Sequence, residues 1–189
     1  MGTYRQAVVD LDASVEDAVE HGRRGRDWLE AEGYIRPVPW EGAVVYLAGP
    51  RWREAVDLAP WDWRASIKAL EREPGEALEV ITGRTVFYAG QGDPPAAICP
   101  HCRNATPTSA WPSDTFDAIA AWYASGVADL DCPACAHRTP LPGWDWTDDY
   151  FAFACLGFQF DDWPPLHPRF TTAFGQALGH RIRVVTGKI

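Results

Sequence analysis

Residues 150–160 read Tyr-Phe-Ala-Phe-Ala-Cys-Leu-Gly-Phe-Gln-Phe and decide the fold that we expect for this chain. The stretch is almost entirely apolar, and its length and aromatic content favour a strand over a helix. A strand that lacks polar alternation buries both of its faces, so it belongs in the interior of a sheet. We therefore predict a central strand here, in which Cys155 is a buried structural thiol.

Shorter elements surround this strand in the sequence. The clearest is a helix at 168–178, whose apolar residues recur at helical spacing and which Gly179 ends. The pattern predicts an α+β fold, with one mixed or antiparallel sheet covered by two or three helices. The other expected elements are strands at 3–11, 43–48 and 181–186, a hairpin of 77–81 with 85–89, and helices at 14–32, 64–72 and 115–125.

Two Cys-x-x-Cys pairs carry the strongest chemical signal, Cys99-Pro100-His101-Cys102 and Cys132-Pro133-Ala134-Cys135. Each pair points two sulfurs at one centre, and together they complete the tetrahedral ligand set of a closed Zn²⁺ site. We predict that Cys99, Cys102, Cys132 and Cys135 bind one structural zinc ion. Another metal such as iron, disulfides and free thiols are the alternatives that the spacing leaves open.

These pairs resemble the knuckles of zinc ribbons, and the resemblance covers about residues 96–142. It implies a metal-ordered module and leaves the rest of the chain undefined. The sequence departs from the family at Arg103 and Ala136, where many ribbon knuckles have glycine. The spacing also resembles the iron site of rubredoxins, but the missing glycines and the helix expected between the pairs favour zinc.

We expect the module to be an insertion in a single domain. Glycine and proline at 90–95 and 140–143 bracket residues 96–142 with chain-breaking positions. A chain of 189 residues buries roughly 70% of its unfolded surface, so its fold does not require a metal staple. Residues 1–189 are therefore expected to form one α+β domain, with a zinc-binding insertion at 96–142. Within the insertion, the helix should face inward through Phe116, Ile119, Ala120 and Tyr123.

The charge balance argues against general binding to nucleic acid or to an anionic membrane. The chain has 26 acidic and 17 basic residues, and a formal net charge of −9. Residues 163–189 contain basic residues and no acid, but the rest of the chain is strongly acidic. Arg103, His137 and Arg138 are expected to offset the negative charge of the thiolates rather than to contact phosphate.

The sequence predicts a cytoplasmic protein. Its first residues are polar and charged, and no run approaches the 18 apolar residues of a membrane-spanning helix. Thiols paired for a metal, together with the odd Cys155, suit a reducing compartment. An excess of arginine over lysine suggests a bacterial source.

A cluster of acidic residues and one histidine flank the central strand and give the main alternative. Such groups act as acids, bases or cation ligands when they share a site, but an extended strand keeps its two ends far apart. The residues concerned are Asp145, Asp148, Asp149, Asp161, Asp162 and His167.

We expect a zinc-binding cytosolic protein that works by protein–protein interaction, as adaptors and immunity proteins do, rather than an enzyme. A small enzyme built on the groups around 144–167 is one alternative. A zinc ribbon that contacts nucleic acid is the other.

Overall fold

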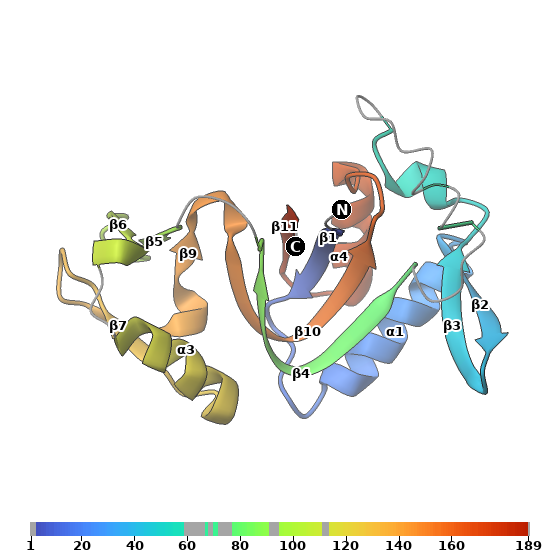
Figure 1. The fold of residues 1–189 in the computed structure, drawn as a ribbon. Helices are drawn as coiled ribbons and strands as arrows, with labels where there is room; N and C mark the ends of the chain where they lie inside the picture. The colour runs from blue at the N-terminus through green and yellow to red at the C-terminus, as the bar shows by residue number, and fades with distance from the viewer. Residues whose placement is uncertain are drawn as a thin grey trace.

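The computed structural model describes residues 3–58, 67, 70–71, 77–90, 95–110 and 114–188. In these ranges the chain forms an α+β fold of antiparallel sheets and helices, which confirms the expected fold class (Figure 1). Most of the helix expected at 64–72 and of the linker at 90–95 lies outside the described residues.

Four strands form the main sheet, in the order β11-β1-β10-β4, and every neighbouring pair is antiparallel. The central-strand prediction is confirmed, because β10 lies between β1 and β4. With its two helices the sheet has the β-α-β-β-α-β arrangement, in which a strand from the other half splits each β-α-β unit. The elements are β1 Tyr4–Asp10, α1 Ala18–Ala31, β4 Glu79–Tyr88, β10 Phe151–Asp161, α4 Pro168–Leu178 and β11 Ile182–Lys188.

One face of the sheet packs against α1 and α4 and contains the largest apolar cluster. Phe158 of β10 lies edge-on to Phe174 of α4, with 4.8 Å between ring centroids. Both side chains are fully buried, as is Leu29 of α1. Gly179 ends α4 with a φ of 74°, as the sequence signal predicts, and at the start of the helix His167 Nδ1 accepts a hydrogen bond from the N–H of Arg169.

The opposite face of the sheet carries a smaller apolar cluster. Its buried residues come from the strands of the sheet and from Ala89, the residue after β4. Curvature of the sheet closes this face, because Gly90 bridges Lys188 at the far edge. Glycine is required at position 187, where a Cβ atom would lie only 1.4 Å from the carbonyl oxygen of Ala89. The two edges of the sheet therefore meet at one end.

The hairpin expected within 77–89 is wrong, because this stretch forms the single strand β4. Gly83 has a φ of 94°, and the register between β4 and β10 shifts between Ala154 and Leu156. The positive φ that glycine adopts is compatible with a β-bulge as well as with a turn. Both strands bend strongly, and the segment that contains the cysteine pairs connects their outer ends (Figure 1).

A two-stranded hairpin follows α1, and the sequence indicated only its second strand. It consists of β2 Ile35–Trp40 and β3 Ala43–Ala48. Pro37 and Pro39 argue against a central strand, but a two-stranded ribbon has free edges that tolerate proline. Positive φ at Glu41 and Gly42, 48° and 85°, gives the two-residue turn. A short 3₁₀ helix, η1 Trp52–Ala55, comes next.

The module between β4 and β10 has its own core, which includes Trp122, Trp144 and Trp146 and therefore extends beyond the expected bound at residue 142. It joins the main sheet through Phe153 of β10, whose ring lies edge-on to Trp122 at 5.4 Å. Its elements are β5 Ala96–Ile98, β6 Ala105–Pro107, η2 Thr108–Ala110, α3 Asp114–Ser125, β7 Asp129–Asp131, β8 Arg138–Pro140, η3 Leu141–Gly143, β9 Asp145–Trp146 and η4 Thr147–Asp149.

The helix expected between the cysteine pairs is present as α3, but its inward face was assigned wrongly. Ala120 and Tyr123 are exposed, whereas Trp122 is buried and Ile119 is half-buried. All of these residues are apolar or aromatic, so periodicity alone could not decide which side of the helix packs. The large indole of Trp122 fills the module core instead. The side chain of Phe116 lies outside the described part.

Candidate metal centre

Two short hairpins present the cysteines, and both have the same hydrogen-bond pattern. In the first, the N–H of Cys99 donates to the carbonyl of Asn104 at 3.0 Å, and the N–H of Arg103 donates to the carbonyl of Cys99 at 3.0 Å. In the second, the N–H of Cys132 donates to the carbonyl of His137 at 2.9 Å. The N–H of Ala136 donates back to Cys132 at 2.8 Å.

The residue after each second cysteine is left-handed, although neither is glycine. Arg103 has a φ of 60° and Ala136 a φ of 58°. Left-handed backbone costs a residue with a Cβ roughly 1–2 kcal/mol. Both turns therefore adopt, without glycine, a backbone conformation that glycine would accept at a lower cost.

The four sulfurs gather around one point. Each of the four cysteines places its Sγ atom within 4.8 Å of the others. Sulfurs from different hairpins lie 3.8 Å apart in Cys99 and Cys135 and 3.7 Å apart in Cys102 and Cys132. A tetrahedral ion with a metal–sulfur distance of about 2.3 Å has sulfurs ~3.8 Å apart. A disulfide needs about 2.05 Å, so these are free thiols at a spacing that suits a metal.

The pKa values of two of the four thiols are shifted in opposite directions. Burial opposes ionisation of Cys99, but the N–H groups of Cys102 and His101 and the nearby sulfurs lower the pKa of its thiol to about 7. The N–H of His137 favours the thiolate of Cys135, yet burial and the three other sulfurs raise the pKa of that thiol to about 12. A bound divalent cation reverses this balance, because it deprotonates the thiols that it binds.

Asp145 links the first knuckle to the main sheet. Its carboxylate accepts a hydrogen bond from Arg103 at 2.6 Å and another from Arg183 of β11 at 2.8 Å. The hydrogen bond from Arg103, followed by the charge of Arg183, holds the pKa of Asp145 below its usual range. The residue beside Cys102 is thus tied to a strand that belongs to the other end of the chain.

The other polar residues beside the knuckles face each other or nearby carboxylates. The rings of His101 and His137 are in contact, with 3.6 Å between their centroids. Arg138 pairs with Asp129 at 3.3 Å and with Asp131 at 3.6 Å. Positive charge next to the cysteines is therefore already matched by carboxylates of the module.

The structure keeps the acidic groups at the two ends of the central strand apart, and it brings Asp145 and Asp149 together at Arg183. Asp161 accepts a hydrogen bond from Arg5 at 3.1 Å, and Asp162 accepts one from the N–H of Tyr4 at 2.9 Å. At the other end of β10, Asp149 pairs with Arg183 at 3.4 Å, and Asp148 is exposed. Together with His167, which caps α4, most of these groups hold the fold at separate places.

Sequence reasoning missed one buried polar cluster. Asp10 at the end of β1 is fully buried, and His180 Nδ1 lies 2.9 Å and 3.0 Å from its two carboxylate oxygens. The ring of His21 on α1 touches that of His180. No motif marks these residues, because they are 11 and 159 positions apart along the chain.

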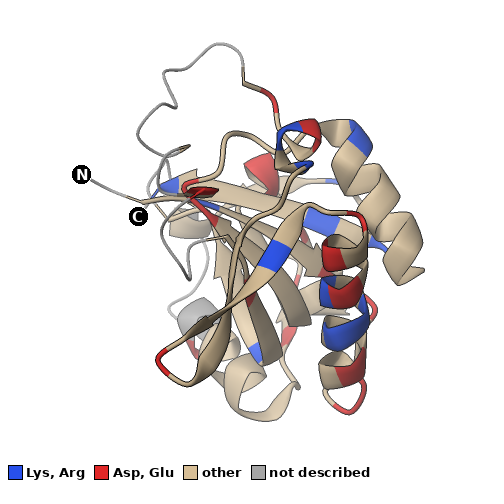
Figure 2. Cartoon of the chain, turned by 90° about the vertical axis from the view of Figure 1, so that its right-hand side faces the viewer, with Lys and Arg blue, Asp and Glu red and all other residues tan. Residues whose placement is uncertain are grey.

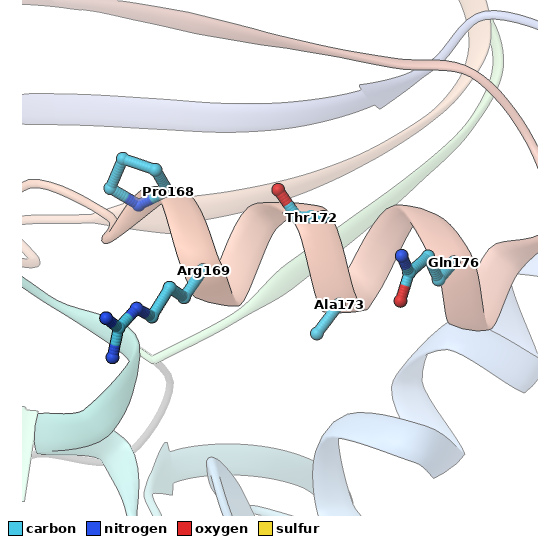
Figure 3. A pocket seen from close by; sticks show the side chains of 5 residues that line it. All are labelled: Pro168, Arg169, Thr172, Ala173 and Gln176. Carbon is cyan, nitrogen blue, oxygen red and sulfur yellow. The ribbon is translucent and has the colours of Figure 1, made fainter.

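A shallow hollow of about 330 Å³ lies on the outer side of α4 (Figure 3). None of the metal-ligand or acid–base candidates from the sequence is among the described residues that line it. The described side chains that line it all come from this one helix, and they are Pro168, Arg169, Thr172, Ala173 and Gln176.

Acidic and basic residues are interspersed along the ribbon in the view of Figure 2. On α1, for example, Arg23 pairs with Glu20 at 2.6 Å and with Asp27 at 2.7 Å. Every helix in the described part of the chain is too short or too polar to cross a bilayer.

Comparison of the chain with protein-family models, with curated proteins and with solved structures found no match.

Proposed function

We propose that this chain is a cytoplasmic zinc protein in which Cys99, Cys102, Cys132 and Cys135 hold a structural Zn²⁺. In this proposal the ion orders the inserted module, and the protein acts by binding another protein, in an adaptor or immunity-like role. The observation that carries the metal assignment is the convergence of four thiols within 4.8 Å.

A structural role follows from the ligand set. Four sulfurs fill a tetrahedral shell, and no position remains for water or substrate. Thiolates are soft ligands, so they favour zinc over the hard cations calcium and magnesium. The buried Cys99 and Cys132 belong to the apolar cluster of the module, so an ion held by the four cysteines would join the two knuckles within that cluster.

Two features of the module support a protein partner. Tyr123 and Val127 are 60% and 72% exposed, and solvent-facing apolar side chains of this size suit a protein surface better than phosphate. Arg103 and Arg138 are each engaged by carboxylates, so they offer little free charge to nucleic acid. No contact within the described residues favours the enzyme alternative.

The metal is tested by elemental analysis of the purified protein. We expect about one zinc per chain, a colourless protein, and loss of the zinc in Cys132→Ser. Replacement by Co²⁺ should give the intense visible absorption of tetrahedral cobalt thiolate. A preparation without zinc, or a red iron protein, would overturn the assignment.

The partner is tested separately with a photo-crosslinking residue at Tyr123 in the zinc-loaded chain. We expect a specific adduct in native cells that is absent when the crosslinker replaces Val44, which is also exposed but lies on the β2–β3 hairpin. Equal labelling from both positions would argue against a module-based interaction, while the zinc analysis would stand.

A further inference from the structure

We propose that His21 and His180 form a second, open metal site for a divalent transition ion, with Asp10 as its supporting carboxylate. The site lies where the end of β1, the start of α1 and the turn before β11 meet, and it shares no residue with the cysteine centre. It does not depend on the function proposed above.

The first observation is the orientation of His180. Asp10 is fully buried, and its carboxylate also accepts hydrogen bonds from the N–H groups of Asp12 and Ala13, at 3.0 Å and 2.9 Å. This fixed carboxylate faces Nδ1 of His180, so Nε2 is the ring nitrogen that remains to bind an ion. A carboxylate bound to the far nitrogen is the arrangement that orients metal-binding histidines.

The second observation concerns His21. Its Nδ1 atom is buried and has no hydrogen-bond partner in the described part of the chain. A buried polar atom without a partner costs about 1–3 kcal/mol, so such an atom indicates a missing ion or water. A metal ion supplies the partner directly.

The third observation is the spacing of the rings, whose centroids are 4.4 Å apart at an angle of 40°. Two imidazoles that bind one ion at about 2.1 Å have centroids ~4.5–5 Å apart when their bonds to the ion meet at 90–105°. The observed ring separation is close to this range. The side chain of His180 is 22% exposed, which provides an entry route.

Two nitrogens leave the other coordination positions to water, so the site is open and its ion exchangeable. Imidazole ligands select ions such as Zn²⁺, Ni²⁺, Co²⁺ or Cu²⁺, and they disfavour Ca²⁺ and Mg²⁺. The site thus differs from the cysteine centre in ligand type, openness and position.

The test is a titration of the zinc-loaded, ¹⁵N-labelled full chain with Ni²⁺, followed by NMR. Paramagnetic Ni²⁺ should broaden the amide signals around His21 and His180, and the broadening should saturate at one added equivalent. His21→Gln should weaken binding by at least about tenfold, and Asp10→Asn by about 10–100-fold. Retained zinc and an unchanged spectrum elsewhere will show that each variant is folded.

The matched control is the second contacting pair, His101 and His137, which lacks a carboxylate bonded to either ring in the described contacts. His101→Gln should leave Ni²⁺ binding near His21 unchanged. The proposal is overturned if broadening centres on His101 and His137, if no saturable broadening occurs near His21, or if His21→Gln binds Ni²⁺ as the parent does. Zinc at the cysteine centre is read out independently in every sample.

Discussion

The helix-covered sheet and the metal module achieve burial in different ways. The sheet packs α1 and α4 over β10 and excludes water with large side chains such as Phe158, Phe160 and Phe174. In its described residues the module has five strands of two or three residues and one α-helix, and two of its buried side chains are cysteines. A small core of this kind is marginal by itself, and a metal bound by the four cysteines would add the stability that it lacks.

The two regions nevertheless share one pair of strands. The inner halves of β4 and β10 belong to the sheet core, and their outer halves reach the module through Val86 and Phe153. Because the two regions are buried in different ways, we expect the free energy of local opening to change along each of these two strands. The following predictions test this gradient.

Loss of the metal should have the largest effect. Binding of structural zinc contributes about 10–16 kcal/mol in small zinc peptides, so Cys132→Ser should unfold the module. Hydrogen exchange should then speed up in β5 to β9 and at Val86 and Phe153. Protection should persist at Phe158 and through α4. Global loss of protection would mean that the two regions form one cooperative unit.

The control for this experiment is Cys155→Ala, since Cys155 packs at the edge of the sheet core and lies apart from the four-cysteine group. This variant should keep full zinc content and lose about 1 kcal/mol of unfolding free energy by packing alone. Zinc loss in Cys155→Ala would place the ligand set elsewhere.

Gly25→Ala should damage the sheet and spare the module. A Cβ atom at position 25 would lie 2.3 Å from Cζ of Phe158, which is fully buried against Phe174 and cannot move freely. Overpacking of this kind costs about 1–3 kcal/mol, more than the gain in helix propensity of about 1 kcal/mol. The measurement is urea unfolding followed by far-UV circular dichroism, with zinc content as the second readout.

The matched control is Gly22→Ala, one turn earlier on the same helix. There the nearest atom to a new Cβ is Cγ1 of Val80 at 3.0 Å. The side chain of Val80 therefore has to move much less than that of Phe158 at position 25. We expect Gly22→Ala to be close to neutral. Equal destabilisation by both variants would contradict the tight contact at position 25.

Ala136→Gly should stabilise the second knuckle. Glycine relieves the cost of a φ of 58°, and it gives back part of the gain through the entropy of the unfolded chain. We expect a net gain of about 0.5–1 kcal/mol in the free energy of opening of the module, measured by hydrogen exchange at Leu130. Ala134→Gly, which has no positive φ to relieve, should give no gain.

The cysteine geometry and the sheet core were largely readable from the sequence, because each rests on a local signal. The spacing of the cysteine pairs fixed a candidate ligand set, and the apolar run at 150–160 marked the central strand. The stripe around Phe170 and Phe174 marked α4. In each case the residue types themselves carry the chemistry or the burial.

The features that the sequence did not predict depend on contacts between residues that are far apart along the chain. Gly83 looked like a turn because the bulge that it forms exists only when β4 pairs with β10. The inner face of α3 was misjudged because only the module core selects Trp122 over Tyr123. The contact of Asp10 with His180 arises from the sheet topology, which places the end of β1 beside the start of β11. These pairings produce no local pattern in the amino-acid sequence.

The smallest effect should come from the link between the two regions, Asp145 with Arg183. Arg183 is only 17% exposed, and the pair lies at 2.8 Å. In a double-mutant cycle of Asp145→Asn and Arg183→Gln, we expect a coupling of about 0.5–1 kcal/mol in module opening. The control is the pair of Asp12 and Arg181, whose arginine is 77% exposed, and whose coupling should be smaller.

The pH dependence of this coupling follows from the lowered pKa of Asp145. Because Arg103 and Arg183 depress that pKa in the folded protein, the carboxylate stabilises the fold fully above the ordinary aspartate value of about 3.9. The contribution is lost only as pH falls through the lowered value. The coupling should therefore be constant from about pH 8 to about pH 5, where thiolate sites still hold zinc. A coupling that declines within this window would show that the carboxylate is not held by the two arginines, and that the module rests on the sheet through apolar contacts alone.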